Sequence, residues 1–236
     1  MGRSTESRLR VVAVRLGRER LRLHLGCGQY HLDGYVNIDF PLTEHTLQQT
    51  SVADEFRDLT DMRYPAETVE EVRLHHVFEH FPRPQAAALV ASWHSWLRRG
   101  GTLRIEVPDF DATAALVLDP ETPVRDRHVA IRHIFGSNEA SWATHYDGWS
   151  ESRLCELVDA FGFEIGEIRR NEYLATRNVE VIAERLGRRV TKESALQAAR
   201  EHLRLFTLDE SDFERNLLDI WLAQFQAQLE RTFASW

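Results

Sequence analysis

The sequence feature that most constrains the fold is a series of short apolar segments, each ending in glycine or a polar residue. In the first segment, residues 21–25, leucines alternate with polar residues and lead into the turn Gly26-Cys27-Gly28. Such alternation is typical of a β-strand, and the glycines are typical of a tight turn. Four further segments are expected to be strands, with the second of them the weakest: residues 35–40, 56–59, 71–76 and 103–107.

Helices are expected between and after these strands. Pro82 and Pro84 predict the start of a helix that Gly100-Gly101 would close, and Ser150 predicts the start of another. Residues 163–168 and 179–183 then form two strand-like segments with no helix between them, which indicates an antiparallel pair. Strands that alternate with helices predict an α/β sheet.

The last part of the chain is expected to be helical, because no proline follows Pro123 and no glycine follows Gly187. Thr207 matches a capping box, which predicts the start of a long helix. Aromatic and leucine residues then repeat every four positions: Phe213, Leu217, Trp221, Phe225, Leu229 and Phe233. This stripe could pack on the chain's own helices, on a second copy or on a neighbouring domain. We predict a homodimer with this helix in the interface.

The chain is therefore divided into an N-terminal arm or helix at residues 1–20, an α/β domain at residues 21–187 and a C-terminal helical extension at residues 188–236. The net charge of -8 argues against a general nucleic-acid binder. No apolar run approaches the roughly 18 residues of a membrane span. Two cysteines form no disulfide framework, so a cytoplasmic location is expected.

Three features of the α/β domain are candidates for ligand binding. The glycine turn lets the backbone approach a ligand closely. Asp39 ends the second strand, where a carboxylate can accept hydrogen bonds from a ribose diol. Asp58 and the backbone of Leu59 could bind the edge of an adenine. Cys27 has no basic partner nearby in the sequence, so it is not expected to be a nucleophile.

A cluster of histidines, HHVFEHF at residues 75–81, ends the segment that begins at residue 71. Three histidines and a glutamate could bind a metal ion, or they could only join a loop to the following helix. Because consecutive side chains of a strand point to opposite faces, His75 and His76 are not expected to share a ligand. We therefore predict no metal site.

The ordered motifs LHLGCG, VNIDF, DLTDM, HHVFEHF and LRRGGTLRIEVPDF resemble those of class I S-adenosylmethionine-dependent methyltransferases. The resemblance covers residues 20–185 and is closer to the small bacterial type found with glycan and surface-polysaccharide genes. It implies a Rossmann-like, mostly parallel seven-stranded sheet with a terminal antiparallel hairpin. It also implies S-adenosylmethionine as cofactor, bound by Gly26, Cys27, Gly28, Asp39, Asp58, Leu59 and His76.

The sequence departs from this family in three ways. His24 stands where the family often has an acidic residue, and a third glycine is absent. Only six residues separate Gly28 from Tyr35, too few for a regular first helix. A turn through residues 29–34 is expected to replace that helix.

The expected reaction is methyl transfer to a small-molecule or glycan acceptor, at a hydroxyl oxygen. His145 and Asp109 are the candidate catalytic residues, although His145 could be bonded to backbone and Asp109 could cap a turn. Tyr146 and Trp149 could stack on a sugar ring. Two alternatives are a non-catalytic interaction module with the same fold and a nicotinamide-dependent oxidoreductase, which would need G-x-G-x-x-G before a full helix.

Overall fold

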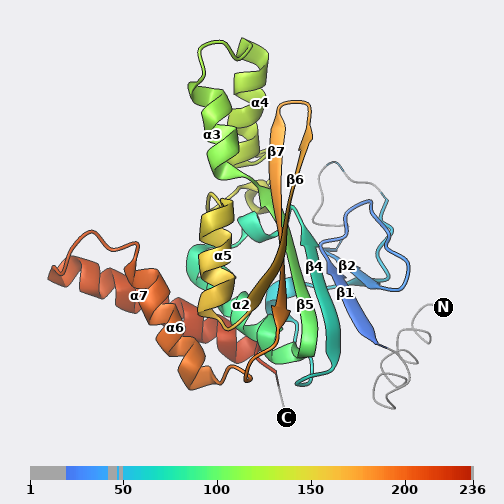
Figure 1. Cartoon of the computed structure of the whole chain (residues 1–236), viewed down its shortest axis with the longest axis vertical. Coiled ribbons are helices and arrows are strands. Elements are labelled where there is room, and N and C mark those ends of the chain that lie inside the picture. Colours follow the sequence, from blue (N-terminus) through green and yellow to red (C-terminus); the bar gives the residue numbers. More distant parts are fainter. Residues whose placement is uncertain (1–19, 42–46, 48–49, 235–236) are drawn as a thin grey trace.

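The structure is a computed structural model that describes residues 20–41, 47 and 50–234. Its centre is one seven-stranded sheet (Figure 1). The strands in order across the sheet are β3 (Glu55–Phe56), β2 (Val36–Asp39), β1 (Leu21–Leu25), β4 (Val69–His75), β5 (Leu97–Pro108), β7 (Thr176–Arg185) and β6 (Glu164–Tyr173). The first five are parallel, and β7 is antiparallel to both of its neighbours. The predicted fold class is confirmed.

Six α-helices and three short 3-10 helices lie within the described residues. The α-helices are α2 (Arg83–Trp96), α3 (Phe110–Leu118), α4 (Val124–Phe135), α5 (Glu151–Ala160), α6 (Lys192–Arg204) and α7 (Asp212–Thr232). The 3-10 helices are η2 (Leu59–Asp61), η3 (Phe78–His80) and η4 (Ser141–Ala143). Figure 1 shows α3 and α4 as a pair beside the far end of the β6–β7 hairpin. Within the described part of the chain, no helix is long and apolar enough to cross a membrane.

The chain order reverses beside β1, which has β2 on one side and β4 on the other. Gly26 follows β1 and packs directly against Val77, which follows β4. A Cβ added to Gly26 would lie 2.2 Å from Val77 Cγ2, and the backbone φ there is +68°. Only glycine fits both this close approach and this left-handed conformation.

No α-helix joins β1 to β2 in residues 26–35, all of which the structure describes. The predicted turn is confirmed. Asn37 holds this turn in place: its Oδ1 accepts a hydrogen bond from the Leu32 backbone N at 2.9 Å, and its Nδ2 donates to the Leu32 carbonyl at 3.1 Å. The buried His24 ring also contacts Asn37 Oδ1, at 3.0 Å from its Nδ1.

The two faces of the sheet differ in character. One face is apolar and packs into the main hydrophobic cluster. On the other face, the strand register aligns polar residues across four neighbouring strands: Asn37, His24, Arg73 and Arg104. Arg104 Nη2 donates a hydrogen bond to Glu180 Oε1 at 2.8 Å, so the charge of Arg104 is paired with that of Glu180 on the neighbouring strand β7. Parallel sheets usually carry apolar side chains on both faces. This sheet differs from that pattern, because one of its two faces is polar.

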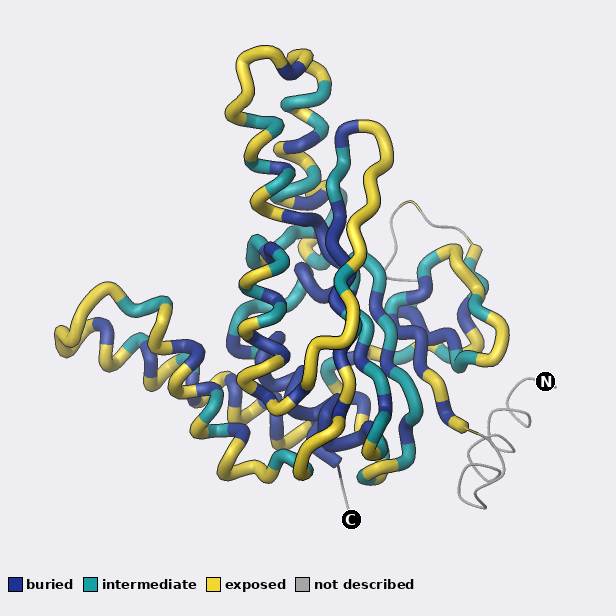
Figure 2. The backbone as a smooth tube through the Cα atoms, in the orientation of Figure 1, coloured by how far each residue is buried: buried dark blue, intermediate teal, exposed yellow. Residues whose placement is uncertain are grey.

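Helix α2 lies at the centre of the hydrophobic core, and its residues from Ala86 to Trp96 are all buried (Figure 2). The end of α7 is fastened to it by hydrogen bonds. Trp96 Nε1 donates to the Thr232 carbonyl at 2.8 Å, and the Ser92 and Thr232 hydroxyls lie 2.7 Å apart. The backbone N of Ala234 donates to Ser95 Oγ at 3.0 Å.

The predicted end of helix α2 is wrong. Gly100-Gly101 does not close the helix, because α2 ends at Trp96 and β5 begins at Leu97. The glycine pair lies where the β4–β5 register shifts, and Gly100 has a φ of +72°. A Cβ on Gly101 would lie 2.8 Å from the Arg98 carbonyl oxygen. The glycines therefore permit a bulge at the start of the strand.

The predicted start and stripe of the long helix also need correction. The N-cap is Ser211, whose Oγ accepts from the Glu214 backbone N at 3.3 Å, and Thr207 instead donates to the Arg204 carbonyl after α6. Successive residues of a helix turn by about 100°, so a step of four residues drifts by about 40° around it. Phe213 is accordingly 74% exposed, whereas Phe225 is buried and stacks on Phe161.

Both C-terminal helices contribute to the same hydrophobic cluster as the sheet. Ala195, Ala199 and Leu203 of α6 belong to it, as do Phe225 and Leu229 of α7. The chain's own core therefore covers the second half of the predicted stripe. The domain boundary at residue 187 stays a prediction. The predicted N-terminal arm, residues 1–20, lies outside the described residues except for Arg20.

Candidate active site

The structure brings the predicted site residues to one edge of the sheet. The predicted site residues lie at or just after the carboxyl ends of β1 to β5, taken in that order: the glycine turn, Asp39, Asp58, His76 and Asp109. Parallel strands end at the same edge, and the reversal of chain order beside β1 opens a crevice there in folds of this kind. Most of the candidate residues therefore share one region of the molecule.

The two glycines of the turn differ in their surroundings, since Gly26 packs against Val77 and Gly28 has open space beside it. Gly28 has a φ of +53°, and a Cβ added there would meet no atom within 4 Å. Cys27 between the glycines is buried. Burial, together with the charge of Asp39, raises the pKa of the Cys27 thiol to about 12. The thiol is therefore protonated near neutral pH, as expected for a cysteine that is not a nucleophile.

The two aspartates differ in exposure. Asp39 is buried, and its Oδ1 accepts a hydrogen bond from the Phe40 backbone N at 2.8 Å. Asp58 is exposed and caps η2, since its Oδ1 accepts from both the backbone N and the hydroxyl of Thr60, at 2.8 and 2.7 Å. This cap positions Leu59, which is buried.

His76 lies between two carboxylates. Its Nδ1 is 3.3 Å from Glu79 Oε1, and its Nε2 is 3.5 Å from Glu106 Oε1. Burial by itself lowers the pKa of His76, but the two carboxylates outweigh burial and raise this pKa to about 10. His76 is therefore an imidazolium near neutral pH. Its backbone φ is +52°, a left-handed conformation that non-glycine residues rarely adopt.

Glu79 is the most buried ionisable group of the site, at 1% exposed. Neither of its carboxylate oxygens accepts a hydrogen bond from any described residue. Burial raises the pKa of Glu79, but the neighbouring His76 outweighs burial and holds the pKa below its usual value. A buried carboxylate kept ionised mainly by one neighbouring histidine is costly, so such groups often mark functional sites.

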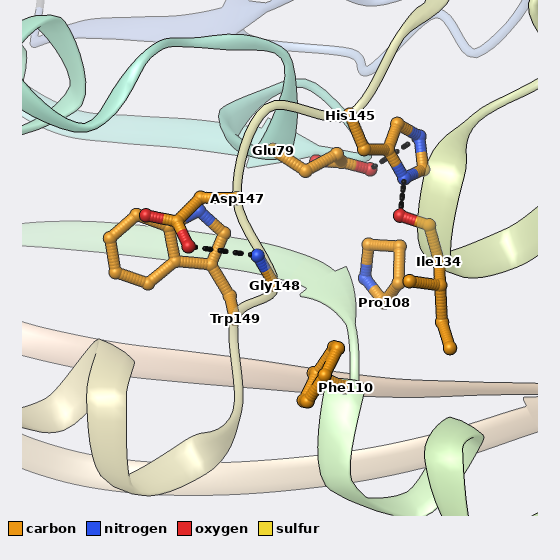
Figure 3. Close-up of a pocket in the computed structure, with 8 residues that line it drawn as sticks. All are labelled: Glu79, Pro108, Phe110, Ile134, His145, Asp147, Gly148 and Trp149. Carbon is orange, nitrogen blue, oxygen red and sulfur yellow. Dashed lines mark hydrogen bonds and ion pairs between the residues drawn. The ribbon is translucent and has the colours of Figure 1, made fainter.

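His145 faces Glu79 from a loop that two elements hold in place (Figure 3). Its backbone N donates to the Phe135 carbonyl at 3.2 Å, and the next backbone N, of Tyr146, donates to the Glu79 carbonyl at 2.9 Å. The ring Nδ1 donates to the Ile134 carbonyl at 3.2 Å, which leaves the lone pair on Nε2. That Nε2 lies 3.9 Å from Glu79 Oε1. Burial lowers the pKa of His145, so the ring is neutral near pH 7.

A small cavity of about 10 Å³ adjoins His145 and Glu79, roughly the room that one water molecule needs. Pro108, Phe110 and Ile134 form its other side (Figure 3). Two glycines permit the close packing around it. A Cβ on Gly136 would lie 2.1 Å from the Ala143 carbonyl oxygen, and one on Gly148 would lie 2.4 Å from the Phe110 ring.

Two of the predicted acceptor-side residues have packing or capping contacts. Trp149 is 1% exposed, and its ring packs 5.0 Å from the ring of Phe78, so it presents no open face to a sugar. Asp109 is buried and caps α3, since its Oδ1 accepts from the Ala112 backbone N at 3.2 Å. Tyr146 is 56% exposed beside His145 and remains a candidate for stacking.

The sequence prediction did not include three residues that the structure adds to the site: Glu79, His80 and Glu106. Glu79 and His80 stood within the histidine cluster, but their partner His145 is far away in the sequence. Glu106 faces His76 across the β4–β5 pair. Its alternation with the apolar residues of β5 was the signal that could have placed it on the polar face.

Comparison with known proteins identifies the fold and no closer relationship. No protein-family model matches the chain, and no curated protein matches it. Among solved structures, the chain matches a Haloferax volcanii protein that forms a complex with the Trm112 methyltransferase activator. The TM-score is 0.50 at 13% identity, over 73% of this chain and 86% of that chain.

Two S-adenosylmethionine-dependent methyltransferases also match. The protein from Methanosarcina mazei gives a TM-score of 0.49 at 14% identity, over 72% of this chain and 94% of that chain. The 1,6-didemethyltoxoflavin-N1-methyltransferase of Burkholderia thailandensis gives 0.47 at 16% identity, over 75% and 76%. Identities this low show the fold alone. The match to the Haloferax volcanii protein therefore agrees with the Rossmann-like sheet described above, at the level of the fold.

Proposed function

We propose that this protein is an S-adenosylmethionine-dependent methyltransferase that acts on a hydroxyl oxygen of a small-molecule or glycan acceptor. One observation carries the proposal. The glycine turn, Asp39 and His76 lie at the carboxyl edge of the sheet on the two sides of β1. The buried Glu79 and its half-buried partner His145 lie beside them.

The residues present fit this cofactor at the glycine turn. The open space at Gly28, where an added Cβ meets nothing within 4 Å, leaves room for a ligand to contact the backbone. By the resemblance of the motifs, Gly26, Cys27 and Gly28 would contact the cofactor, Asp39 would hold its ribose, and Asp58 with Leu59 its adenine. His76 would lie near its methionine or adenosine portion. When bound, the cofactor supplies an electrophilic methyl group on a sulfonium.

The acceptor would bind between Tyr146 and the cavity beside His145. The exposed Tyr146 ring offers a surface for stacking on an acceptor ring. With Nδ1 engaged by the Ile134 carbonyl, His145 Nε2 is positioned to accept the proton of an acceptor hydroxyl. The nearby Glu79 carboxylate favours the imidazolium that this transfer produces, as the third group of a catalytic triad does. Asp109 is left out of this role because it caps α3.

The alternative is a module with the same fold that binds partners and does not catalyse. A nicotinamide-dependent oxidoreductase is less well supported, since a dinucleotide fingerprint needs a full helix directly after the glycine turn. Here residues 26–35, all described, contain no α-helix. Binding of the cofactor separates the methyltransferase from the other two.

The test is calorimetric titration of the intact protein with S-adenosylhomocysteine. We expect binding that weakens more than tenfold in Asp39→Ala and also in Asp39→Asn, because the charge-assisted hydrogen bonds to the ribose are lost. Asp33→Ala is the matched control, since the Asp33 carboxylate is fully exposed in the loop before β2. Unchanged affinity in both Asp39 variants would remove Asp39 from the site. Absence of any binding by the unaltered protein would contradict the proposed function.

A further inference from the structure

The buried carboxylate of Glu79 lies among three histidines. His76 Nδ1 and His145 Nε2 lie 3.3 and 3.9 Å from its Oε1, and His80 belongs to the same cluster. One donor atom each of Glu79, His80 and His145 lies within 4.8 Å of those of the other two. The rings of His80 and His145 lie edge to face, with centroids 4.8 Å apart.

Both rings are oriented as metal ligands usually are. His80 Nδ1 donates to the Thr144 carbonyl at 3.2 Å, and His145 Nδ1 donates to the Ile134 carbonyl at 3.2 Å. A carbonyl oxygen only accepts, so in each ring the proton is on Nδ1 and the lone pair is on Nε2. Histidines that bind a metal through one nitrogen almost always donate the other N–H to such a partner.

The charges around Glu79 also favour a cation. Glu79 and Glu106 are two carboxylates, and His76 lies between them. Even a protonated His76 offsets only one of their two charges. Both oxygens of Glu79 are buried and accept no hydrogen bond from the described residues. A metal ion would satisfy a carboxylate oxygen that water does not reach.

We propose that Glu79, His80 and His145 bind one divalent transition-metal ion, with zinc as the ion that this ligand set favours. Two histidines and a glutamate form a known catalytic zinc ligand set, whose fourth position holds water. The cavity of about 10 Å³ beside His145 and Glu79 has room for that water. Imidazole ligands disfavour magnesium and calcium, which prefer oxygen.

Small movements complete this site. In a tetrahedral zinc site the ligand atoms lie about 3.4 Å apart, given metal–ligand bonds of about 2.0–2.2 Å. His145 Nε2 and Glu79 Oε1 are 3.9 Å apart in the structure. All three donor atoms lie within 4.8 Å of one another, so side-chain movements that shorten each separation by about 1.4 Å or less are enough. The backbone hydrogen bonds of the His145 loop hold that ligand in place.

The role of the ion rests on the proposed function, whereas its binding does not. An acceptor hydroxyl that takes the fourth position would have its pKa lowered by the ion and would lose its proton on coordination. His145 Nε2 would then be a ligand, and the ion would replace it as the group that activates the hydroxyl. The acceptor oxygen would form a bond to the methyl carbon of the cofactor while the bond from that carbon to the sulfonium sulfur breaks. S-adenosylhomocysteine would leave, and the released proton would pass to water.

The experiment uses the full chain without an affinity tag, stripped with a chelator and dialysed. Titration with zinc is followed by calorimetry, and cobalt binding is followed by visible absorption. We expect one ion per chain, with binding weakened at least tenfold in Glu79→Gln, His80→Gln and His145→Gln. His133→Gln is the control, because its ring lies near His76 but outside the three ligands. Magnesium is expected not to compete.

Thermal unfolding of each variant shows whether it is folded, and titration with S-adenosylhomocysteine is run on the same samples. Zinc binding below one ion per chain in the unaltered protein would overturn the metal site, as would binding that survives all three substitutions. If the cofactor product still binds in that case, the proposed function stands with His145 as a free base. If zinc binds and the cofactor product does not, the metal site stands and the proposed function fails.

Discussion

Replacing Gly28 with alanine tests whether the glycine turn binds the cofactor, separately from what the turn contributes to folding. Gly28 has a φ of +53°, so alanine there adopts a left-handed conformation that costs about 1–2 kcal/mol. No clash adds to this cost, since the new Cβ would meet nothing within 4 Å. For a chain of this size, the expected fall in melting temperature is about 2–8 °C.

Gly34→Ala is the matched control for this strain. Gly34 has a φ of +83° and also has open space around an added Cβ, but it precedes β2 and lies away from the carboxyl edge. We expect similar losses of melting temperature in the two variants. Only Gly28→Ala should weaken binding of S-adenosylhomocysteine, by more than tenfold, because its methyl group fills the space beside the backbone. Equal affinity in both variants and in the unaltered protein would refute a cofactor that approaches this turn.

Four further predictions concern core packing, pH dependence, assembly and acceptor binding. Phe225→Ala should lower the free energy of unfolding by about 3–5 kcal/mol in urea titrations, because a buried ring is removed from the core. Burial lowers the pKa of His94 to about 4 in the folded protein, whereas in the unfolded chain it stays near 6.5. The unfolded chain therefore binds the proton first, so the contribution of His94 to the free energy of unfolding should be complete above about pH 6.5. This contribution should fall by up to about 3 kcal/mol as the pH is lowered towards 4. His94→Gln should flatten that profile, and an unchanged slope would contradict this assignment. If the protein is a homodimer through α7, changing the exposed Phe213 and Leu208 to Asp should make it monomeric in light scattering. A monomeric mass for the unaltered protein at tens of micromolar would exclude the homodimer. Tyr146→Ala should raise the KM for the acceptor without changing cofactor affinity, and an unchanged KM would remove Tyr146 from the acceptor site.

The ends of the strands were predictable because the signals there are local. The alternating leucines of β1 stop at a glycine that the close approach of Val77 requires, and Asp39 ends β2 as predicted. The same alternation in β4 and β5 also contained the signal for the polar face of the sheet. The prediction did not use it, since an α/β sheet is expected to be covered on both faces.

Other features depend on contacts between distant parts of the chain. Helices α3 and α4 were not predicted, because they bury only Thr113 and Ala130 and so have no apolar stripe. The pairing of Glu79 with His145 depends on a loop that returns to η3 after α4, which no local pattern reveals. Trp149 resembled a surface aromatic in the sequence, yet its ring fills the core beside Phe78.

The long sequence separation between α2 and α7 has a consequence for biosynthesis. Trp96 of α2 donates its indole N–H to Thr232, which is 136 positions further along. At about 5–20 residues per second, a ribosome makes α2 roughly 7–27 s before the residue that completes its hydrogen bonding. For that interval the nascent chain exposes the apolar surface of α2 that α7 will bury. This part of the core can therefore close only after Thr232 has been synthesised.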